Sequence, residues 1–449
     1  SLQFESSIVK INAQKDTLKP KKELKDIDLY RLVSAKSKSI KGNIILFKDF
    51  VFVNPQDDSV KITSLKINKL QIDSGTTIFE PYLFYSQNIT FEIPSKKIFT
   101  ADSTYFMSFN RIKGSTGYKI LEIDGLTYSP TVEFSQFQDK FKEKYPYRAS
   151  PTSIYCSMIL SVDFNYVDFL EHRTIRTQLI NIDSVMLISY LDRNYPHNEK
   201  ARKTNLAQKM LNVPINLDIQ MINIRNFNAK YWEVAPVSNK IAFVTVDNSN
   251  LKVANLINDT SKFTEYNKYF YIENTGKVNQ IADFNIKVFY DLQSKGTRSR
   301  VYGSFEPFDI STFNTYTVYG ANISFDRGFV NKLNFDFDIY DTIAYGQMLM
   351  EYSNLRTSLM EIDTALLKKR KFLSWIINNF VIHTNNPQIG LVPNQGVIAY
   401  IHNPSYSEFK LWAKSILSGA QSTIVFKPKD YRKVKKYFRE KIEKQQNKE

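Results

Sequence analysis

The side chains that could ligate a metal or act as nucleophiles are few and scattered. Four histidines, His172, His197, His383 and His402, lie far apart in the sequence and far from the single cysteine, Cys156. No HExxH pair, GxGxxG loop, Walker A loop or GxSxG nucleophile motif occurs. The sequence therefore predicts a protein that is not an enzyme, with no catalytic residue, no metal site and no cofactor.

One acidic set stands out. Asp336, Asp338 and Asp341 are close enough to bind calcium or to act as paired carboxylates. Two of them are spaced by two residues, however, which places them on one face of a strand. The spacing favours the solvated face of a strand over a site. Cys156, between Tyr155 and Ser157, is expected to be a small buried apolar residue that forms no internal disulfide.

These aspartates belong to the clearest strand of the chain, residues 332–341. Every second residue is apolar, which indicates a strand with one buried face. Strand-like segments follow at 344–352 and 355–362. The apolar positions, with those of neighbouring strands, either line a groove for acyl chains or form ordinary core beneath a helix that contains Trp375. The groove candidates are Phe325, Leu333, Phe335, Phe337, Ile339 and Leu349.

Two helices are predicted after these strands. Helical spacing of apolar residues places one at about 365–380. A second is predicted at about 406–418, where Ser405 and Glu408 have the spacing of a capping box and Gly419 stands at the exit. Both helices are expected to cover the end of a sheet.

An internal repeat organises the earlier part of the chain. Leu65, Ile67, Leu70 and Ile72 recur 152 residues later as Leu217, Ile219, Ile222 and Ile224, which indicates two similar sheet modules. Five segments are predicted: an N-terminal β segment (1–62), two β-groove modules (63–211 and 212–319), a C-terminal sheet with a helical cap (320–429) and a basic helix or tail (430–449).

Composition limits the partners. The 449 residues are 43% hydrophobic and carry a net charge of +15, so the chain is an ordered protein that is suited to anionic partners. The basic residues are mostly scattered, and no nucleic-acid-binding motif is present, which favours an anionic lipid surface over nucleic acid. The most apolar run, 372–382, is about half of the roughly 20 residues that a membrane span requires.

The C-terminal segment is the most local functional feature. Residues 427–449 contain ten Lys or Arg and four acids, a local charge of +6, with Tyr431, Val434, Phe438 and Ile442 on one helical face. Such a helix either lies on an anionic bilayer or docks on the sheet through its apolar stripe. The candidates for contact with a membrane surface are Arg432, Lys433, Lys435, Lys436, Arg439 and Lys441.

Three segments resemble a known family. Residues 378–387 (NNFVIHTNNP), 396–400 (GVIAY) and 411–419 (LWAKSILSG) resemble the C-terminal end of AsmA-like, TamB-related envelope proteins, in the branch that carries the domain of unknown function 748. Residues 191–196 and 231–233 are similar to its strand-exit and Tyr-x-Glu motifs. The resemblance implies a long curled β-sheet with an apolar groove, tethered to the inner membrane and involved in moving phospholipid to the outer membrane.

Taken together, these observations predict a mainly β fold: an elongated, curled antiparallel sheet of repeated modules, with a few helices near the C-terminus. The expected function is a periplasm-facing carrier or conduit for phospholipid, anchored by an N-terminal helix absent from this chain. Its expected partners are phospholipid, an anionic membrane surface and other envelope proteins. The alternative is a non-enzymatic scaffold or chaperone that offers strand edges to outer-membrane or secreted proteins.

Overall fold

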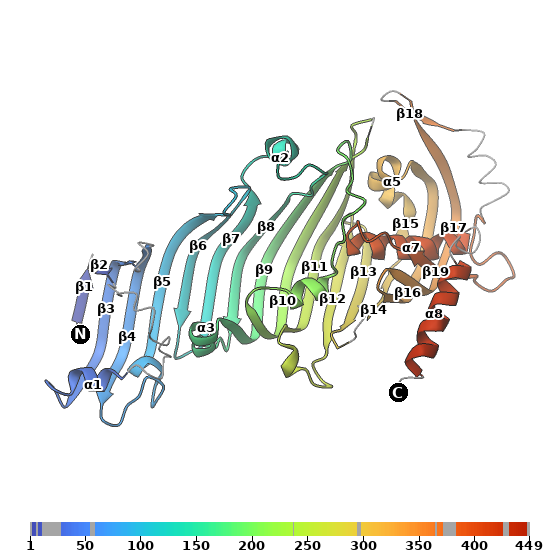
Figure 1. The fold of residues 1–449 in the computed structure, drawn as a ribbon. Coiled ribbons are helices and arrows are strands. Elements are labelled where there is room, and N and C mark those ends of the chain that lie inside the picture. The colour runs from blue at the N-terminus through green and yellow to red at the C-terminus, as the bar shows by residue number, and fades with distance from the viewer. Residues whose placement is uncertain are drawn as a thin grey trace. The chain divides into compact units, whose positions relative to one another are not determined.

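The fold was obtained as a computed structural model (Figure 1), which describes residues 2–5, 8–10, 28–53, 59–236, 238–293, 298–363, 366–370, 383–424 and 431–446. The chain forms two compact units. Unit 1 comprises Ser1–Tyr128, Tyr155–Asp183 and Pro214–Met221, and unit 2 comprises Ser129–Ile154, Ser184–Val213 and Ile222–Glu449. These units cut the chain differently from the five segments predicted above, which stay predictions.

Most described residues belong to strands. In unit 1 lie β1 (Leu2–Glu5), β2 (Ile8–Lys10), α1 (Leu29–Val33), β3 (Ser39–Val53), β4 (Ser59–Asp73), η2 (Leu83–Tyr85), β5 (Ser86–Phe99), β6 (Tyr105–Ser115) and α3 (Tyr166–His172). Four strands have residues in both units: β7 (Ile120–Pro130), β8 (Thr152–Val162), β9 (Thr174–Asp192) and β10 (Asn216–Val234).

Unit 2 contains the remaining elements. They are α2 (Phe134–Lys140), α4 (Leu206–Leu211), β11 (Ile241–Ile257), η3 (Thr260–Lys262), β12 (Tyr269–Val278), β13 (Ala282–Asp291), β14 (Arg298–Phe305), β15 (Phe308–Asp309), η4 (Ile310–Phe313), α5 (Asn314–Gly320), β16 (Ile323–Tyr340), β17 (Ile343–Asp363), β18 (Leu366–Lys369), β19 (Gln395–Ile401), α7 (Glu408–Ile424) and α8 (Tyr431–Gln446).

The predicted mainly β fold with few helices is confirmed. Strands make up 55% of the structure and helices 18%. Most neighbouring strands pair antiparallel, for example β3 with β4 and β16 with β17. Strands β1 and β2 pair with β3 in parallel.

In unit 1, the repeat residues of β4 lie on one face of the sheet despite an irregular step in their spacing. Ile67 pairs with Ile45 and Leu70 pairs with Gly42, and Lys69 between them has a φ of 50°. A Cβ placed on Gly42 would lie 3.5 Å from the Ile45 side chain, so both positions point to the same side. The left-handed residue therefore restores the apolar alternation after a three-residue step.

In unit 2, the alternation predicted for residues 332–341 is confirmed in β16. Leu333, Phe335, Phe337 and Ile339 are buried and belong to one hydrophobic core, and Phe337 is only 1% exposed. The paired positions of β17, such as Met348 opposite Phe335, belong to the same core. The opposite face of β16 carries the polar residues between them.

Helix α7 covers this core, and Figure 1 shows it crossing the strands of unit 2. Two glycines allow the close approach. A Cβ on Gly419 would lie 2.7 Å from Ile398, and a Cβ on Gly396 would lie 2.5 Å from the Gly419 carbonyl oxygen. The prediction that Gly419 ends this helix is wrong, because the helix continues to Ile424 and uses Gly419 as a contact point.

The predicted capping box is also wrong. The Ser405 hydroxyl contacts His197 Nε2 at 2.8 Å, and the Glu408 carboxylate accepts hydrogen bonds from the Leu206 amide (2.8 Å) and the Tyr290 hydroxyl (3.0 Å). Both side chains bind partners distant in the sequence rather than the helix start. Backbone amides of Lys410 and Leu411 instead donate to the Ser407 carbonyl.

Two further expectations change. Residues 366–369 form strand β18, paired with β17, where a helix was predicted from about 365. Residues 371–380 of that predicted helix, which include Trp375, lie outside the described residues. The two predicted strands at 344–352 and 355–362 are parts of the single strand β17, which continues through Asn354 at a φ of 55°.

The filled core of unit 2 makes a stability prediction. Replacing Phe337 with alanine is expected to lower the free energy of unfolding by about 3–5 kcal/mol, because a fully buried ring would leave a cavity. The measurement is chemical denaturation of both proteins. Phe329→Ala is the matched control, since Phe329 lies on the same strand and is 44% exposed. Equal losses for both variants would contradict a core filled at Phe337.

Candidate functional site

Strands β3, β4 and β5 of unit 1 present a continuous apolar surface, here called the apolar face. Cross-strand rows build it: Ile45, Ile67 and Ile89 form one row, and Phe47, Leu65 and Phe91 form the next. All of these side chains are only partly buried. The complete face comprises Ile45, Phe47, Ile62, Leu65, Ile67, Leu70, Ile89 and Phe91.

Small clusters close the ends of the apolar face. At one end Ile72, Ile78 and Tyr85 form a buried cluster against α1, and the Leu29 amide donates to the Tyr85 hydroxyl at 3.1 Å. Farther along, the Tyr166 ring of α3 contacts Phe91 edge-on, with ring centroids 6.2 Å apart. Burial raises the pKa of Tyr166 to about 12. Its hydroxyl accepts from the Ser115 amide and donates to the Ile120 carbonyl.

The opposite side of the same strands is more polar. Lys66 and Lys48 alternate with the apolar positions of β4 and β3, and Arg111 of β6 forms an ion pair with Asp124 at its side. The Asp124 carboxylate raises the pKa of Arg111. The sheet of unit 1 is therefore amphipathic, with the apolar face on one side only.

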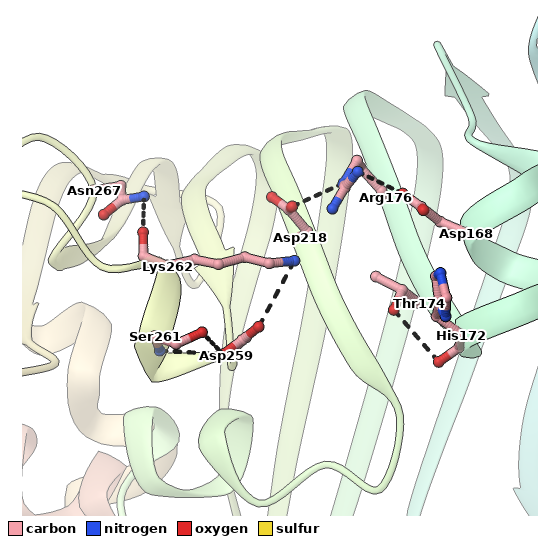
Figure 2. A network of polar contacts seen from close by, with 9 residues as sticks. All are labelled: Asp168, His172, Thr174, Arg176, Asp218, Asp259, Ser261, Lys262 and Asn267. Carbon is pink, nitrogen blue, oxygen red and sulfur yellow. Dashed lines mark hydrogen bonds and ion pairs between the residues drawn. The ribbon is translucent and has the colours of Figure 1, made fainter.

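A polar network holds α3 against the strands. Figure 2 shows Arg176 of β9 between two carboxylates, with Nη1 2.6 Å from Asp168 of α3 and Nε 2.9 Å from Asp218 of β10. Because α3 carries Tyr166, this network also positions one end of the apolar face. The same figure shows a separate unit 2 turn, in which Asp259 accepts hydrogen bonds from the Ser261 amide and hydroxyl.

The groove candidates predicted from sequence lie in unit 2 and do not all share one face. Leu333, Phe335, Phe337 and Ile339 are core residues beneath α7, and Phe325 packs against this core while partly exposed. Leu349 pairs with Asn334 of β16 and Gln395 of β19, on the opposite face. These placements correspond to the ordinary-core alternative for the four buried residues.

Sequence reasoning missed the apolar face of unit 1 as a candidate site. The signal was present in the spacing of Leu65, Ile67, Leu70 and Ile72, which was interpreted only as a repeat. The exposure of these positions depends on what covers them, and spacing alone does not contain that information.

The basic helix α8 packs against strands β16 and β19 of unit 2. Val434 is fully buried against Tyr340 and Ala399, and Tyr431 and Tyr437 pack around it. Five of the predicted membrane-surface residues, Arg432, Lys433, Lys435, Lys436 and Arg439, are exposed. Lys441 belongs to the same helix, but its side chain lies outside the described residues. Val434 and Tyr431 of the apolar stripe thus contact the sheet, and the five described cations face solvent. The side chains of Phe438 and Ile442 lie outside the described residues.

The other residues singled out in the sequence are placed as follows. Asp336 forms a bidentate ion pair with Arg300, at 2.9 and 2.6 Å, and burial raises the pKa of Asp338. Cys156 is buried, as predicted, and burial raises its pKa. His172 and His383 are exposed, His197 is partly buried, and His402 is buried.

Within the described ranges, no three His, Cys, Asp or Glu residues are grouped closely enough to hold a metal ion. None of the helices in the described part of the chain is long and apolar enough to cross a membrane.

Comparison with known proteins adds no family. No protein-family model matches this chain, and no curated protein matches it significantly. The resemblance to AsmA-like proteins therefore stays a prediction.

The docking of α8 can be tested directly. Val434→Asp is expected to release the helix, because a carboxylate would be desolvated against Tyr340 and Ala399. Hydrogen exchange should then show loss of protection over 431–446. Lys433→Asp, at the exposed neighbouring position, is the control and should leave protection unchanged. Retained protection in Val434→Asp would show that the stripe does not hold the helix.

Proposed function

We propose that this protein binds phospholipid through the apolar face of unit 1 and carries or conducts it between the inner and outer membranes of a Gram-negative envelope. The observation behind the proposal is the contrast in burial between equivalent strand faces. In unit 2 the apolar side of β16 is buried under helices, whereas the apolar side of β3, β4 and β5 stays partly exposed. A contiguous apolar patch on a folded protein commonly marks a binding surface.

The chemistry requires no nucleophile or cofactor. Acyl chains would lie along the rows Ile45–Ile67–Ile89 and Phe47–Leu65–Phe91, and the head group would remain in water. Each methylene moved out of water contributes about 0.8 kcal/mol. A lipid can shift from one row to the next without breaking a directional bond, so movement along the face meets only small barriers.

Helix α8 supplies a second part of the proposal, namely contact with an anionic membrane surface in the periplasm. Because Val434 is buried, α8 would act through its exposed cations and not by inserting its apolar stripe. Each cation near an anionic surface contributes about 1 kcal/mol, and this contribution is screened by salt.

A scaffold or chaperone that offers a strand edge is the second candidate. One edge of β3 pairs with β1 at positions 45–48 and with β2 at positions 51–53. In the described part of unit 1, residues 39–44 pair with β4 on the other edge only. An incoming strand could add there. The scaffold requires an accessible edge, whereas the lipid carrier requires an accessible apolar face.

Native mass spectrometry with lipid extraction separates the candidates. Protein purified from its own membrane fraction is expected to carry phospholipid, and the double variant Leu65→Asp, Ile67→Asp should lower the bound fraction about tenfold or more, since a loss of only 1.4 kcal/mol suffices for that factor. The control is Lys66→Asp, Asn68→Asp, which changes the other side of the same strand.

Circular dichroism and thermal melting must first show that both double variants are folded. A wild-type protein that carries no phospholipid and captures none when it is added would contradict the carrier and favour the scaffold. Equal lipid loss in both variants would remove the apolar face as the binding surface.

The α8 contribution is tested by sedimentation with liposomes. Changing Arg432, Lys433, Lys436 and Arg439 to glutamine is expected to weaken binding to anionic vesicles by up to about 4 kcal/mol at low salt, at about 1 kcal/mol for each cation. Binding to zwitterionic vesicles should not change. The matched control replaces four exposed lysines of unit 1, Lys41, Lys48, Lys61 and Lys69. Unchanged binding in the α8 variant would eliminate this role for the helix.

A further inference from the structure

The N-terminal end of α7 meets a connecting segment, residues 196–205, within unit 2. His197 Nε2 lies 2.8 Å from the Ser405 hydroxyl, and the Lys203 amide donates to the Pro404 carbonyl at 2.8 Å. The Asn403 side-chain amide donates to Glu199 at 3.1 Å. These hydrogen bonds hold residues 197–203 against residues 403–405, although the two segments are about 200 residues apart in the sequence.

An aromatic ring organises the side chains at this junction. The Tyr406 ring stacks on the His197 ring, with centroids 4.2 Å apart and planes 7° from parallel. The Lys410 ammonium lies 3.2 Å from the centre of the same Tyr406 ring. Lys410 is therefore held in place by a cation–π contact and not by a carboxylate.

Three cations act electrostatically on His197 at this junction. Within the described part of the chain, Arg148, Lys203 and Lys410 form no ion pair, and the buried Nε of Arg148 has no hydrogen-bond partner. These three cations and His197 are called the basic cluster. The nearby acids are already bound: Glu233 to Arg193 and Tyr231, both at 2.8 Å, and Glu199 to Asn403.

Burial and like charges lower the pKa values of two groups in the basic cluster. Burial, with the charges of Lys414, Arg193 and Arg148, lowers the pKa of Lys410 to about 8, although Glu233 acts in the opposite direction. Burial and then the charges of Arg148, Lys203 and Lys410 lower the pKa of His197, against a raising effect of Glu199. Like charges have been brought together, and Glu233 and Glu199 offset them only in part, since the pKa values of Lys410 and His197 are still lowered.

A pocket of about 190 Å³ opens beside the cluster, with Lys203, Asn205, Gln208, His402 and Tyr406 in its wall. His402 is 7% exposed, and its Nδ1 has no hydrogen-bond partner, while Nε2 lies 3.3 Å from the Tyr406 carbonyl. Glu408 and Asp341 also line the pocket. The Glu408 oxygens are occupied by the Leu206 amide and the Tyr290 hydroxyl.

We propose that the basic cluster and this pocket bind a phosphate-type anion, either a free phosphate or the phosphodiester of a head group. Phosphate oxygens accept hydrogen bonds from guanidinium and ammonium groups. Arg148 offers a buried Nε without a hydrogen-bond partner, and Lys203 and Lys410 offer ammonium groups that form no ion pair in the described part of the chain. The site lies entirely in unit 2, so it does not depend on the apolar face of unit 1. The two proposals can fail separately.

Isothermal titration calorimetry on the full chain tests the proposal, with inorganic phosphate and glycerophosphoethanolamine as separate probes. Lys410→Gln and Arg148→Gln are each expected to weaken binding about tenfold, the effect of losing roughly 1.4 kcal/mol. Lys230→Gln is the matched control, because Lys230 also lies over an aromatic ring, 4.5 Å from the centre of Trp232, outside the cluster.

The two probes distinguish the sources of the anion. Binding of inorganic phosphate alone supports a free-phosphate site, and tighter binding of the diester supports a head-group site. No binding of either probe by the wild-type protein overturns the proposal. Equal weakening by Lys230→Gln and Lys410→Gln overturns it too, because the effect would then be one of overall charge.

The pH dependence gives a readout that needs no variant. Lys410 loses its proton as the pH rises through about 8, so affinity for the diester should fall between pH 7 and pH 9.5. Burial sets this pKa, together with the charges of Glu233, Lys414, Arg193 and Arg148. Saturating diester should raise the pKa of Lys410. The titration of this lysine can be measured by NMR of ¹³C-methylated lysines. A midpoint that does not move with ligand would contradict the site.

Discussion

The structure depends on one constraint: a strand with an apolar side must have that side covered. In unit 2 the cover is α7, and it can lie close to the sheet because Gly419 and Gly396 have no side chains at the contact. A methyl group at either position would meet Ile398 or the Gly419 carbonyl at less than 3 Å. Burial of Phe335, Phe337 and Met348 therefore follows from two glycines as much as from the apolar residues themselves.

In unit 1 the apolar side of β3, β4 and β5 is covered only in part, but the backbone keeps it continuous. Residues with positive φ, Lys69 of β4 and Asp49 of β3, return the apolar side chains to one face after a three-residue step. The contact between Phe47 and Phe50, with ring centroids 5.7 Å apart, crosses such a step. Non-glycine residues at positive φ cost free energy, so their presence here shows that keeping the apolar side continuous outweighs local strain.

Much of the fold could be predicted because it is encoded by local period. The alternation of Leu333 to Ile339 specified both a strand and its buried face, and the apolar stripe of residues 406–418 specified α7. The predictions that failed concern side chains whose partners are distant in the sequence. Glu408 has the spacing of a capping residue, but Tyr290 and Leu206 bind it instead, and local sequence contains no sign of either.

The candidate sites show the same limit. The stripe of α8 is equally suited to a bilayer and to a sheet, and only the position of Val434 against Ala399 distinguishes the two. The basic cluster joins Arg148, Lys203 and Lys410, which are separated by up to 262 residues (410 minus 148). No pattern of spacing predicts that these three cations would all act on His197.

The partial exposure of the apolar face also bears on how lipid would move. An acyl chain that leaves a bilayer for this face exchanges one apolar environment for another, so the roughly 0.8 kcal/mol per methylene that separates water from hydrocarbon largely cancels between the two. A deeply buried cavity would add packing contacts and hold the chain; a face whose side chains remain partly in contact with water would add fewer. The free energies of the two bound states then lie close together. Exchange in both directions would therefore be easy in the proposed carrier, as a carrier requires and a storage site does not.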